Sequence, residues 1–132
     1  MRRIFVDTSA WYDMVFPDTP AHADIEKIMR TSGTKFVTST YVLDELVSLL
    51  LTRKGYSIAA RAASHIRSAP ELRLEHPEAA EEARAWRLFL DRPDKGYTLT
   101  DCLSFVIMRR LGITEALATD DHFRQEGFTV LP

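Results

Sequence analysis

The chain has little of what thiolate- or imidazole-based metal sites require. It contains one cysteine, Cys102, and four histidines with neither HxxxH nor HExxH spacing. The single cysteine excludes an intramolecular disulfide and a cysteine-rich zinc site, and it favours a reducing, cytoplasmic compartment. A secretory signal is not expected, because Met1-Arg2-Arg3 leads directly into a short apolar stretch.

No apolar segment is long enough to cross a membrane. The longest apolar-rich stretch, Leu46 to Leu51, is far shorter than the roughly 20 residues that a transmembrane helix needs. The length of 132 residues, with 45% hydrophobic and 27% charged residues, is typical of a soluble globular chain. We therefore predict a single domain over residues 1–132 that buries one core and has no membrane partner. The net charge of -2 gives no indication of a nucleic-acid partner.

Predicted strands and helices alternate along the chain. The strands are expected at residues 3–7, 35–39, 72–75, 116–119 and 128–131. The helices are expected at residues 9–16, 21–31, 41–53, 57–68, 77–91 and 99–111, with Pro77 in the first turn of its helix and a further helical turn at 122–126. Strands separated by helices predict a three-layer α/β/α fold, in which a central, mainly parallel twisted sheet of four to five strands carries helices on both faces.

An aspartate stands at the end of the first predicted strand. Asp7 follows Arg3-Ile4-Phe5-Val6 directly and opens the run Asp7-Thr8-Ser9-Ala10-Trp11. Open α/β sheets build their ligand sites at the carboxyl ends of the strands, so Asp7 is a candidate site residue. Three further acids follow strands or lie on helices that would pack on the same sheet: Glu45, Asp101 and Asp120.

Each of these acids also has a purely structural explanation. Asp7 can cap the helix that follows it, and Asp101 fits a capping box that begins at Thr98. Glu45 can lie on the solvated face of its helix, and the adjacent Asp44 is almost as good a candidate for the site.

The last acid has a close rival. Asp120 and Asp121 both follow the predicted strand 116–119, and either can cap the next helical turn. His122, the next residue, is expected to be structural or exposed.

A shared site explains the four acids better than four separate caps. Capping accounts for each position but does not predict a common sheet edge. Carboxylates about 4 Å apart repel by roughly 1 kcal/mol per pair in water, and by about 4 kcal/mol at an effective dielectric constant of 20. A cation removes this repulsion, and all-oxygen ligands select a hard ion such as Mg²⁺ or Mn²⁺.

Four segments carry these acids as motifs. They are Val6-Asp7-Thr8-Ser9-Ala10-Trp11, Val42-Leu43-Asp44-Glu45-Leu46, Tyr97-Thr98-Leu99-Thr100-Asp101-Cys102-Leu103-Ser104-Phe105 and Ala116-Leu117-Ala118-Thr119-Asp120-Asp121-His122-Phe123. With these motifs the chain resembles PIN-domain ribonucleases, and specifically the VapC-type toxins of VapBC toxin–antitoxin pairs. The resemblance covers nearly the whole chain, and the third and fourth motifs are the most specific.

The resemblance implies a PIN-like fold and metal-dependent cleavage of RNA. It assigns catalysis and the binding of Mg²⁺ or Mn²⁺ to Asp7, Glu45, Asp101 and Asp120, with Asp121 and Asp94 as secondary candidates. In this chemistry a metal-activated water attacks phosphorus, so no nucleophilic side chain is needed.

Other residues are expected to support this site. Thr8 and Ser9 are candidates to hydrogen-bond the carboxylates or a phosphate, although helix capping explains Ser9 equally well. Lys95 and Arg124 are candidate contacts to RNA phosphates, which position a strand without specifying its sequence.

The resemblance also implies partners: an RNA substrate, a cognate antitoxin protein and a second copy of the chain in a homodimer. Apolar residues of the helices at 41–53 and 57–68 are candidates for the antitoxin groove or the dimer surface. The alternative function is a catalytically degenerate PIN-fold module that binds a protein partner or RNA without cleaving it. The presence of all four acids argues against that alternative. A phosphatase of the haloacid-dehalogenase type is excluded, because it requires a second aspartate where this chain has Ser9.

Overall fold

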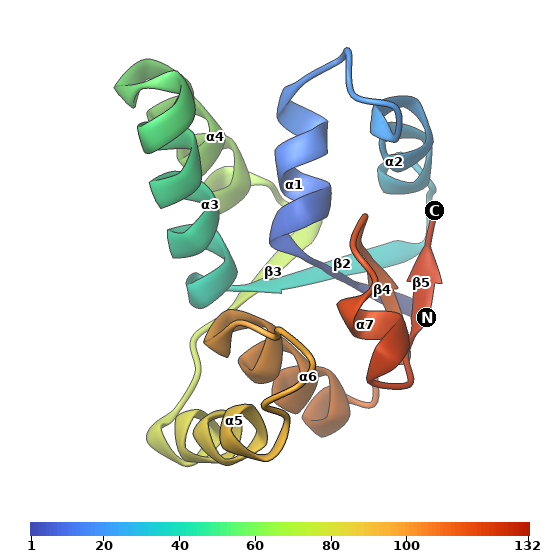
Figure 1. Ribbon diagram of the computed structural model, residues 1–132. Coiled ribbons are helices and arrows are strands. Elements are labelled where there is room, and N and C mark those ends of the chain that lie inside the picture. Colours follow the sequence, from blue (N-terminus) through green and yellow to red (C-terminus); the bar gives the residue numbers. More distant parts are fainter.

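Five parallel strands form one central sheet with the order β3-β2-β1-β4-β5 (Figure 1). The computed structural model describes residues 1–132. The strands are β1 (Arg2–Val6), β2 (Thr34–Ser39), β3 (Leu72–Glu75), β4 (Glu115–Leu117) and β5 (Thr129–Leu131). Every neighbouring pair is parallel, which confirms the predicted sheet and makes it wholly parallel.

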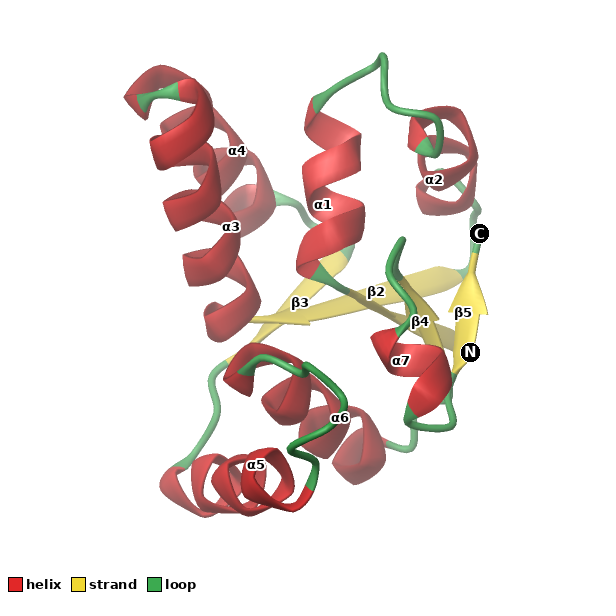
Figure 2. Ribbon diagram, viewed as in Figure 1, coloured by secondary structure: helices red, strands yellow, loops and turns green.

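Seven helices cover the two faces of this sheet (Figure 2). One face carries α1 (Thr8–Val15), α2 (His22–Met29), α3 (Thr40–Lys54) and α4 (Tyr56–Ser68), and the other carries α5 (Ala79–Asp91), α6 (Leu99–Leu111) and α7 (His122–Gln125). The predicted three-layer α/β/α class is therefore confirmed. None of the helices combines the length and the apolar character that a bilayer-spanning segment requires.

Strand β1 lies at the centre of the core. Ile4, Phe5 and Val6 are completely buried, because helices cover both faces of a parallel sheet and leave no solvated side for polar residues. On the face of the sheet that carries α5, α6 and α7, Phe105 of α6 packs edge to face on Phe123 of α7, with ring centroids 4.9 Å apart. This contact fixes α7 against α6, next to the carboxyl end of β4.

Most predicted boundaries differ from the observed ones by one or two residues, and two of these differences have a local cause. Helix α5 begins at Ala79 rather than at Pro77, because Glu78 is extended and its N–H donates to the carboxylate of Glu81 at 3.3 Å, which caps the helix there. Strand β4 ends at Leu117 rather than at residue 119.

The early end of β4 has a local cause. The N–H of Thr119 donates to the hydroxyl oxygen of Ser9 at 3.0 Å instead of to a neighbouring strand. Asp120 is consequently separated from its strand by two loop residues, which carry it over the end of the sheet.

The order of the strands creates a switch point between β1 and β4. The chain proceeds from β1 to β2 and β3 on one side, and then returns to place β4 and β5 on the other side of β1. The last residues of the two central strands, Val6 and Leu117, pair directly. Ligand sites of open α/β sheets form in the crevice outside the carboxyl ends of the strands at this point, and Asp7 is the first residue there.

Candidate active site

Three carboxylates from separate parts of the chain meet above the switch point. Asp7 comes from the end of β1, Asp101 from the first turn of α6 and Asp120 from the loop after β4. The negative charges of Asp101 and Asp120 both raise the pKa of Asp7, and the charge of Asp120 also raises the pKa of Asp101. The three acids therefore share one electrostatic environment.

Asp7 is the most buried of the three and is only 2% exposed. Its Oδ2 accepts hydrogen bonds from the Ser9 hydroxyl at 2.7 Å and from the Ser9 N–H at 3.2 Å, so the residue also caps α1. Its Oδ1 is buried and has no partner. Burial raises the pKa of Asp7 to about 7, assisted by the charges of Asp101 and Asp120 and opposed by the hydrogen bonds from Ser9.

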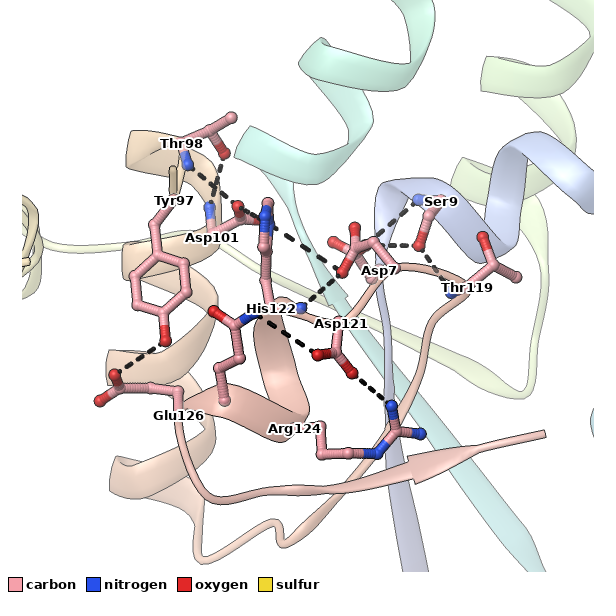
Figure 3. Close-up of polar contacts among 12 residues, drawn as sticks. Asp7, Ser9, Tyr97, Thr98, Asp101, Thr119, Asp121, His122, Arg124 and Glu126 are labelled. Atoms are coloured by element: carbon pink, nitrogen blue, oxygen red, sulfur yellow. Dashed lines mark hydrogen bonds and ion pairs between the residues drawn. The ribbon is translucent and has the colours of Figure 1, made fainter. Parts of the chain in front are cut away.

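Asp101 caps helix α6 as its sequence context suggests. Its Oδ2 accepts from the N–H of Thr98 at 2.9 Å, and the Thr98 hydroxyl oxygen accepts from the N–H of Asp101 at 3.0 Å (Figure 3). The same Oδ2 lies 2.9 Å from Nδ1 of His122. Burial raises the pKa of Asp101, and the hydrogen bond from Thr98 and the nearby His122 oppose this rise. Asp101 therefore both caps α6 and belongs to the acidic group.

The geometry favours Asp120 over Asp121 as the fourth motif's acid. Asp120 is half-buried, and its Oδ1 accepts from the N–H of His122 at 3.1 Å. Asp121 is exposed and pairs with Arg124, and its Oδ2 accepts from Gln125 at 3.4 Å. Asp121 therefore turns toward its own helical turn, and only Asp120 contributes charge to the environment of Asp7.

The remaining candidate acids do not join the group. Glu45 is half-buried on α3 and takes part in no hydrogen bond or ion pair, while its neighbour Asp44 is exposed. Asp94 and Lys95 are both exposed in the loop between α5 and α6. The assignment of Glu45 to the site thus rests on its motif rather than on a contact.

Thr8 and Ser9 lie directly against the acids. The Ser9 hydroxyl donates to Asp7 and accepts from the N–H of Thr119, so it joins the ends of β1 and β4. The hydroxyl oxygen of Thr8 is buried and, like Oδ1 of Asp7, has no partner. Two adjacent unpartnered oxygen atoms at one sheet edge are unusual, because buried polar atoms are ordinarily hydrogen-bonded.

His122 is the site residue for which the sequence predicted no role. It bonds two of the acids, Asp101 through Nδ1 and Asp120 through its backbone N–H, and its ring packs edge to face on Tyr97 at 5.4 Å. Its place two residues after Asp120, at the first position of α7, is the sequence signal that could have indicated this role.

A network of hydrogen bonds and ion pairs around the Glu126 side chain supports this arrangement. The Glu126 carboxylate accepts from the Tyr97 hydroxyl at 3.2 Å (Figure 3). It also pairs with Arg109 at 2.8 Å and with Arg92 at 3.3 Å. Burial acts to raise the pKa of Glu126, but the two arginines outweigh it and hold the pKa below its ordinary value. This network fixes the end of α7 and therefore the position of His122.

The donor set fits a hard divalent cation. No three acidic, histidine or cysteine side chains are close enough to enclose an ion. The carboxylates nevertheless present oxygen ligands, and Asp7 combines an unpartnered buried oxygen with a pKa of about 7. A buried carboxylate in this state lacks the positive charge that would stabilise its ionised form.

These features define an α/β protein with a carboxylate site at the switch point of its sheet. The PIN domain profile matches residues 4–128, and the chain belongs to the PIN-domain family. VapC20 of Mycobacterium tuberculosis, described as a 23S rRNA-specific endonuclease, is 35% identical over 125 residues, which are 95% of each chain. The predicted family is therefore confirmed.

Solved structures agree with this assignment. The crystal structure of Mycobacterium tuberculosis VapC20, described as a toxin that cleaves the sarcin–ricin loop, superimposes with a TM-score of 0.89 over 98% of this chain and 99% of that one, at 35% identity. VapBC-1 from nontypeable Haemophilus influenzae gives a TM-score of 0.67 at 13% identity over 97% and 96% of the two chains. FitAcB from Neisseria gonorrhoeae gives 0.63 at 12% identity over 98% and 96%. The last two likenesses concern the fold alone.

Proposed function

We propose that this protein is a metal-dependent endoribonuclease, and that it acts in the cytoplasm as the toxin of a type II toxin–antitoxin pair. The observation that carries the proposal is the meeting of Asp7, Asp101 and Asp120 at the switch point, with a buried oxygen of Asp7 left free. The 35% identity to VapC20 over 95% of both chains supports it. Through the same relative we propose large-subunit ribosomal RNA, and its sarcin–ricin loop in particular, as the substrate.

Asp7, Asp101 and Asp120 would hold Mg²⁺ or Mn²⁺, with Glu45 joining them from α3. When bound, the cation supplies a water that loses its proton more readily and neutralises charge on the phosphate and the leaving oxygen. Ser9 holds the Asp7 carboxylate in place, and Thr98 does the same for Asp101. These hydrogen bonds orient the two acids before any ligand binds.

No side chain of the site is suited to act as a nucleophile. Cys102, next to Asp101, is completely buried, and burial raises the pKa of its thiol to about 11. The thiol is therefore neutral at physiological pH and weakly nucleophilic. This agrees with hydrolysis by an activated water. Lys95 and Arg124, both exposed, are the proposed first contacts to RNA phosphates.

An apolar groove of about 990 Å³ is the proposed binding site of the antitoxin. It lies between α1, α4 and the strands β2 and β3, and its lining includes Trp11, Phe16, Ile58, Ile66 and Leu72. Helix α4 therefore contributes to the groove as its apolar sequence suggests. Helix α3 contributes no lining residue. An amphipathic segment of the partner would bury its apolar side chains here.

A second apolar surface supports the proposed homodimer. Trp86, Phe89 and Leu90 of α5 are 52%, 37% and 70% exposed. The rings of Trp86 and Phe89 pack edge to face with centroids 6.0 Å apart. Clustered exposed apolar side chains of this size are typical of protein interfaces.

The test of the proposed function is RNA cleavage under metal control. Purified protein incubated with ribosomal RNA is expected to cut it in millimolar Mg²⁺ or Mn²⁺ and to stop when the metal is chelated. Asp7→Asn and Asp101→Asn are expected to lower the cleavage rate by a factor of about 100 or more, as loss of a metal ligand does. Asp44→Asn and Asp121→Asn are the matched controls, since both acids are exposed and outside the acidic group.

Two outcomes contradict the proposal in different ways. Cleavage by Asp7→Asn at the wild-type rate means that the site is wrongly assigned. Metal-independent RNA binding by the wild-type protein, without any cut, identifies the degenerate binding module instead.

A further inference from the structure

A hollow of about 600 Å³ lies along the seam between α5 and α6. Its seven lining residues are Arg84, Arg87, Leu88, Asp91, Val106, Arg109 and Arg110. Four of the seven are arginines, in a chain whose net charge is -2. We call this hollow the arginine cleft.

Two of the arginines are held in place by buried glutamates. Arg110 donates through Nε to Glu81 at 2.6 Å and through Nη2 to Glu75 at 2.5 Å, and both glutamates are buried. Arg109 donates through Nη2 to Glu126 at 2.8 Å. A guanidinium group has five N–H donors in a rigid plane, so each of these arginines keeps donors free for a further anion while its position is fixed.

The other two arginines have no acidic partner. Arg84 and Arg87 are exposed, lie one turn apart on α5 and form no ion pair. Like charges at this spacing are mildly unfavourable in an isolated helix. Asp91 is the only acid among the lining residues, so Arg84 and Arg87 are the arginines of the cleft whose charge no ion pair neutralises. Planar guanidinium groups around one hollow suit phosphate oxygens, which arginine binds through two parallel hydrogen bonds.

The cleft lies within reach of RNA that occupies the acidic site. Arg109 follows Asp101 by eight residues on the same helix, which corresponds to roughly 12 Å along the axis. A strand of duplex carries one phosphate per about 3.4 Å of axis, so a few nucleotides cover this distance. Helices α5 and α6 lie on the face of the sheet opposite α1 and α4 (Figure 1), so RNA in the cleft does not compete with a partner in the apolar groove.

We infer that the arginine cleft is a second RNA-binding site, in which Arg84, Arg87, Arg109 and Arg110 bind backbone phosphates a few nucleotides away from the cleaved bond. The inference rests on the proposed function. It explains how a protein with an acidic site and a net negative charge binds a polyanion. The arginines of the cleft attract the RNA phosphates at a short distance from the carboxylates.

The test uses RNA affinity and its dependence on salt. Arg84→Ala/Arg87→Ala is introduced into the Asp7→Asn protein, which is expected to hold RNA without cutting it, and the probe is a fluorescently labelled stem-loop with the sarcin–ricin sequence. Loss of two phosphate contacts is expected to weaken binding about tenfold or more at low salt, and to reduce the slope of log affinity against log salt by about 1.4–1.8. Both arginines are exposed, so thermal melting is expected to stay unchanged.

Arg67→Ala in the same Asp7→Asn background is the matched control, because Arg67 is exposed on α4, on the opposite face of the sheet, and also forms no ion pair. It is expected to change neither affinity nor slope. Equal affinity and equal slope in the double variant and the control overturn the inference and leave the proposed function intact. Failure of the wild-type protein to bind or cut any RNA overturns both.

Discussion

Nδ1 of His122 lies 2.9 Å from Oδ2 of Asp101, and the backbone N–H of the same histidine donates to Asp120 at 3.1 Å. One residue therefore holds two acids that belong to different motifs. Because an ionised carboxylate cannot donate, the bond to Asp101 requires a proton on Nδ1 of His122. His122 is thus a positioning residue for the acids.

Replacing His122 by Ala is expected to weaken the site without unfolding the protein. Asp101 keeps its bond from Thr98 but loses its bond from His122. Removing a partner that orients a metal ligand ordinarily lowers metal affinity or activity by about 10–100-fold. The measurement is the midpoint of stabilisation in a Mn²⁺ titration followed by thermal melting. His76→Ala, at an exposed loop position, serves as the control, and equal midpoints for both variants would contradict the role of His122.

Asp7→Asn is expected to stabilise the metal-free protein at alkaline pH. The pKa of Asp7 is raised to about 7 in the folded state, so folding favours the protonated acid. The stabilisation of the folded state by protonated Asp7 is fully present below its unfolded pKa of about 3.9 and is lost as pH rises toward 7. Complete ionisation at pH 8 therefore costs at most about 4 kcal/mol, which the neutral amide avoids.

Thermal melts at pH 5 and pH 8 in a chelator check this expectation. The variant is expected to gain stability over wild type at pH 8 and much less at pH 5, and to lose the stabilisation that Mn²⁺ gives the wild-type protein. A variant that is equally destabilised at both pH values would show that Asp7 is ionised and satisfied without a cation.

Ser9→Ala is expected to loosen the loop that carries Asp120. The hydroxyl of Ser9 donates to Asp7 and accepts from Thr119, so its removal breaks two bonds and leaves a backbone N–H without its partner. The expected loss of stability is about 1–2 kcal/mol, with a fall in cleavage rate at saturating RNA. Ser57→Ala, exposed on α4, is the control. An unchanged rate in Ser9→Ala would contradict a role of the Ser9 hydroxyl in positioning the acids.

Particular residues show how far the sequence alone could go. The alternation of apolar strands and helices was sufficient for the α/β/α class, and the strand-end position of Asp7 was sufficient to place it at the carboxyl edge of the sheet. The choice between Asp120 and Asp121 was not available from the sequence, since both follow the same strand. That choice depends on the contact between Thr119 and Ser9, which are 110 positions apart. His122 was missed for the same reason, because its role arises only when α6 and α7 pack together.

The network around Glu126 predicts how the fold responds to acid. Burial acts against ionisation of Glu126, but Arg109 and Arg92 hold its folded pKa below the ordinary value. The stabilisation is therefore complete above the unfolded pKa of about 4.3 and is lost as pH falls through the lower folded pKa. Glu126→Gln is expected to cost about 1.5–3 kcal/mol at pH 7, the range for hydrogen bonds to a charged group, and much less at pH 3. Urea unfolding at both pH values measures this difference, and Glu71→Gln, an exposed acid, controls for a change in net charge. Because Glu126 also fixes the end of α7, the variant is expected to lose cleavage activity at pH 7 together with stability. A destabilised variant with full activity would show that the Glu126 network does not position the acidic site.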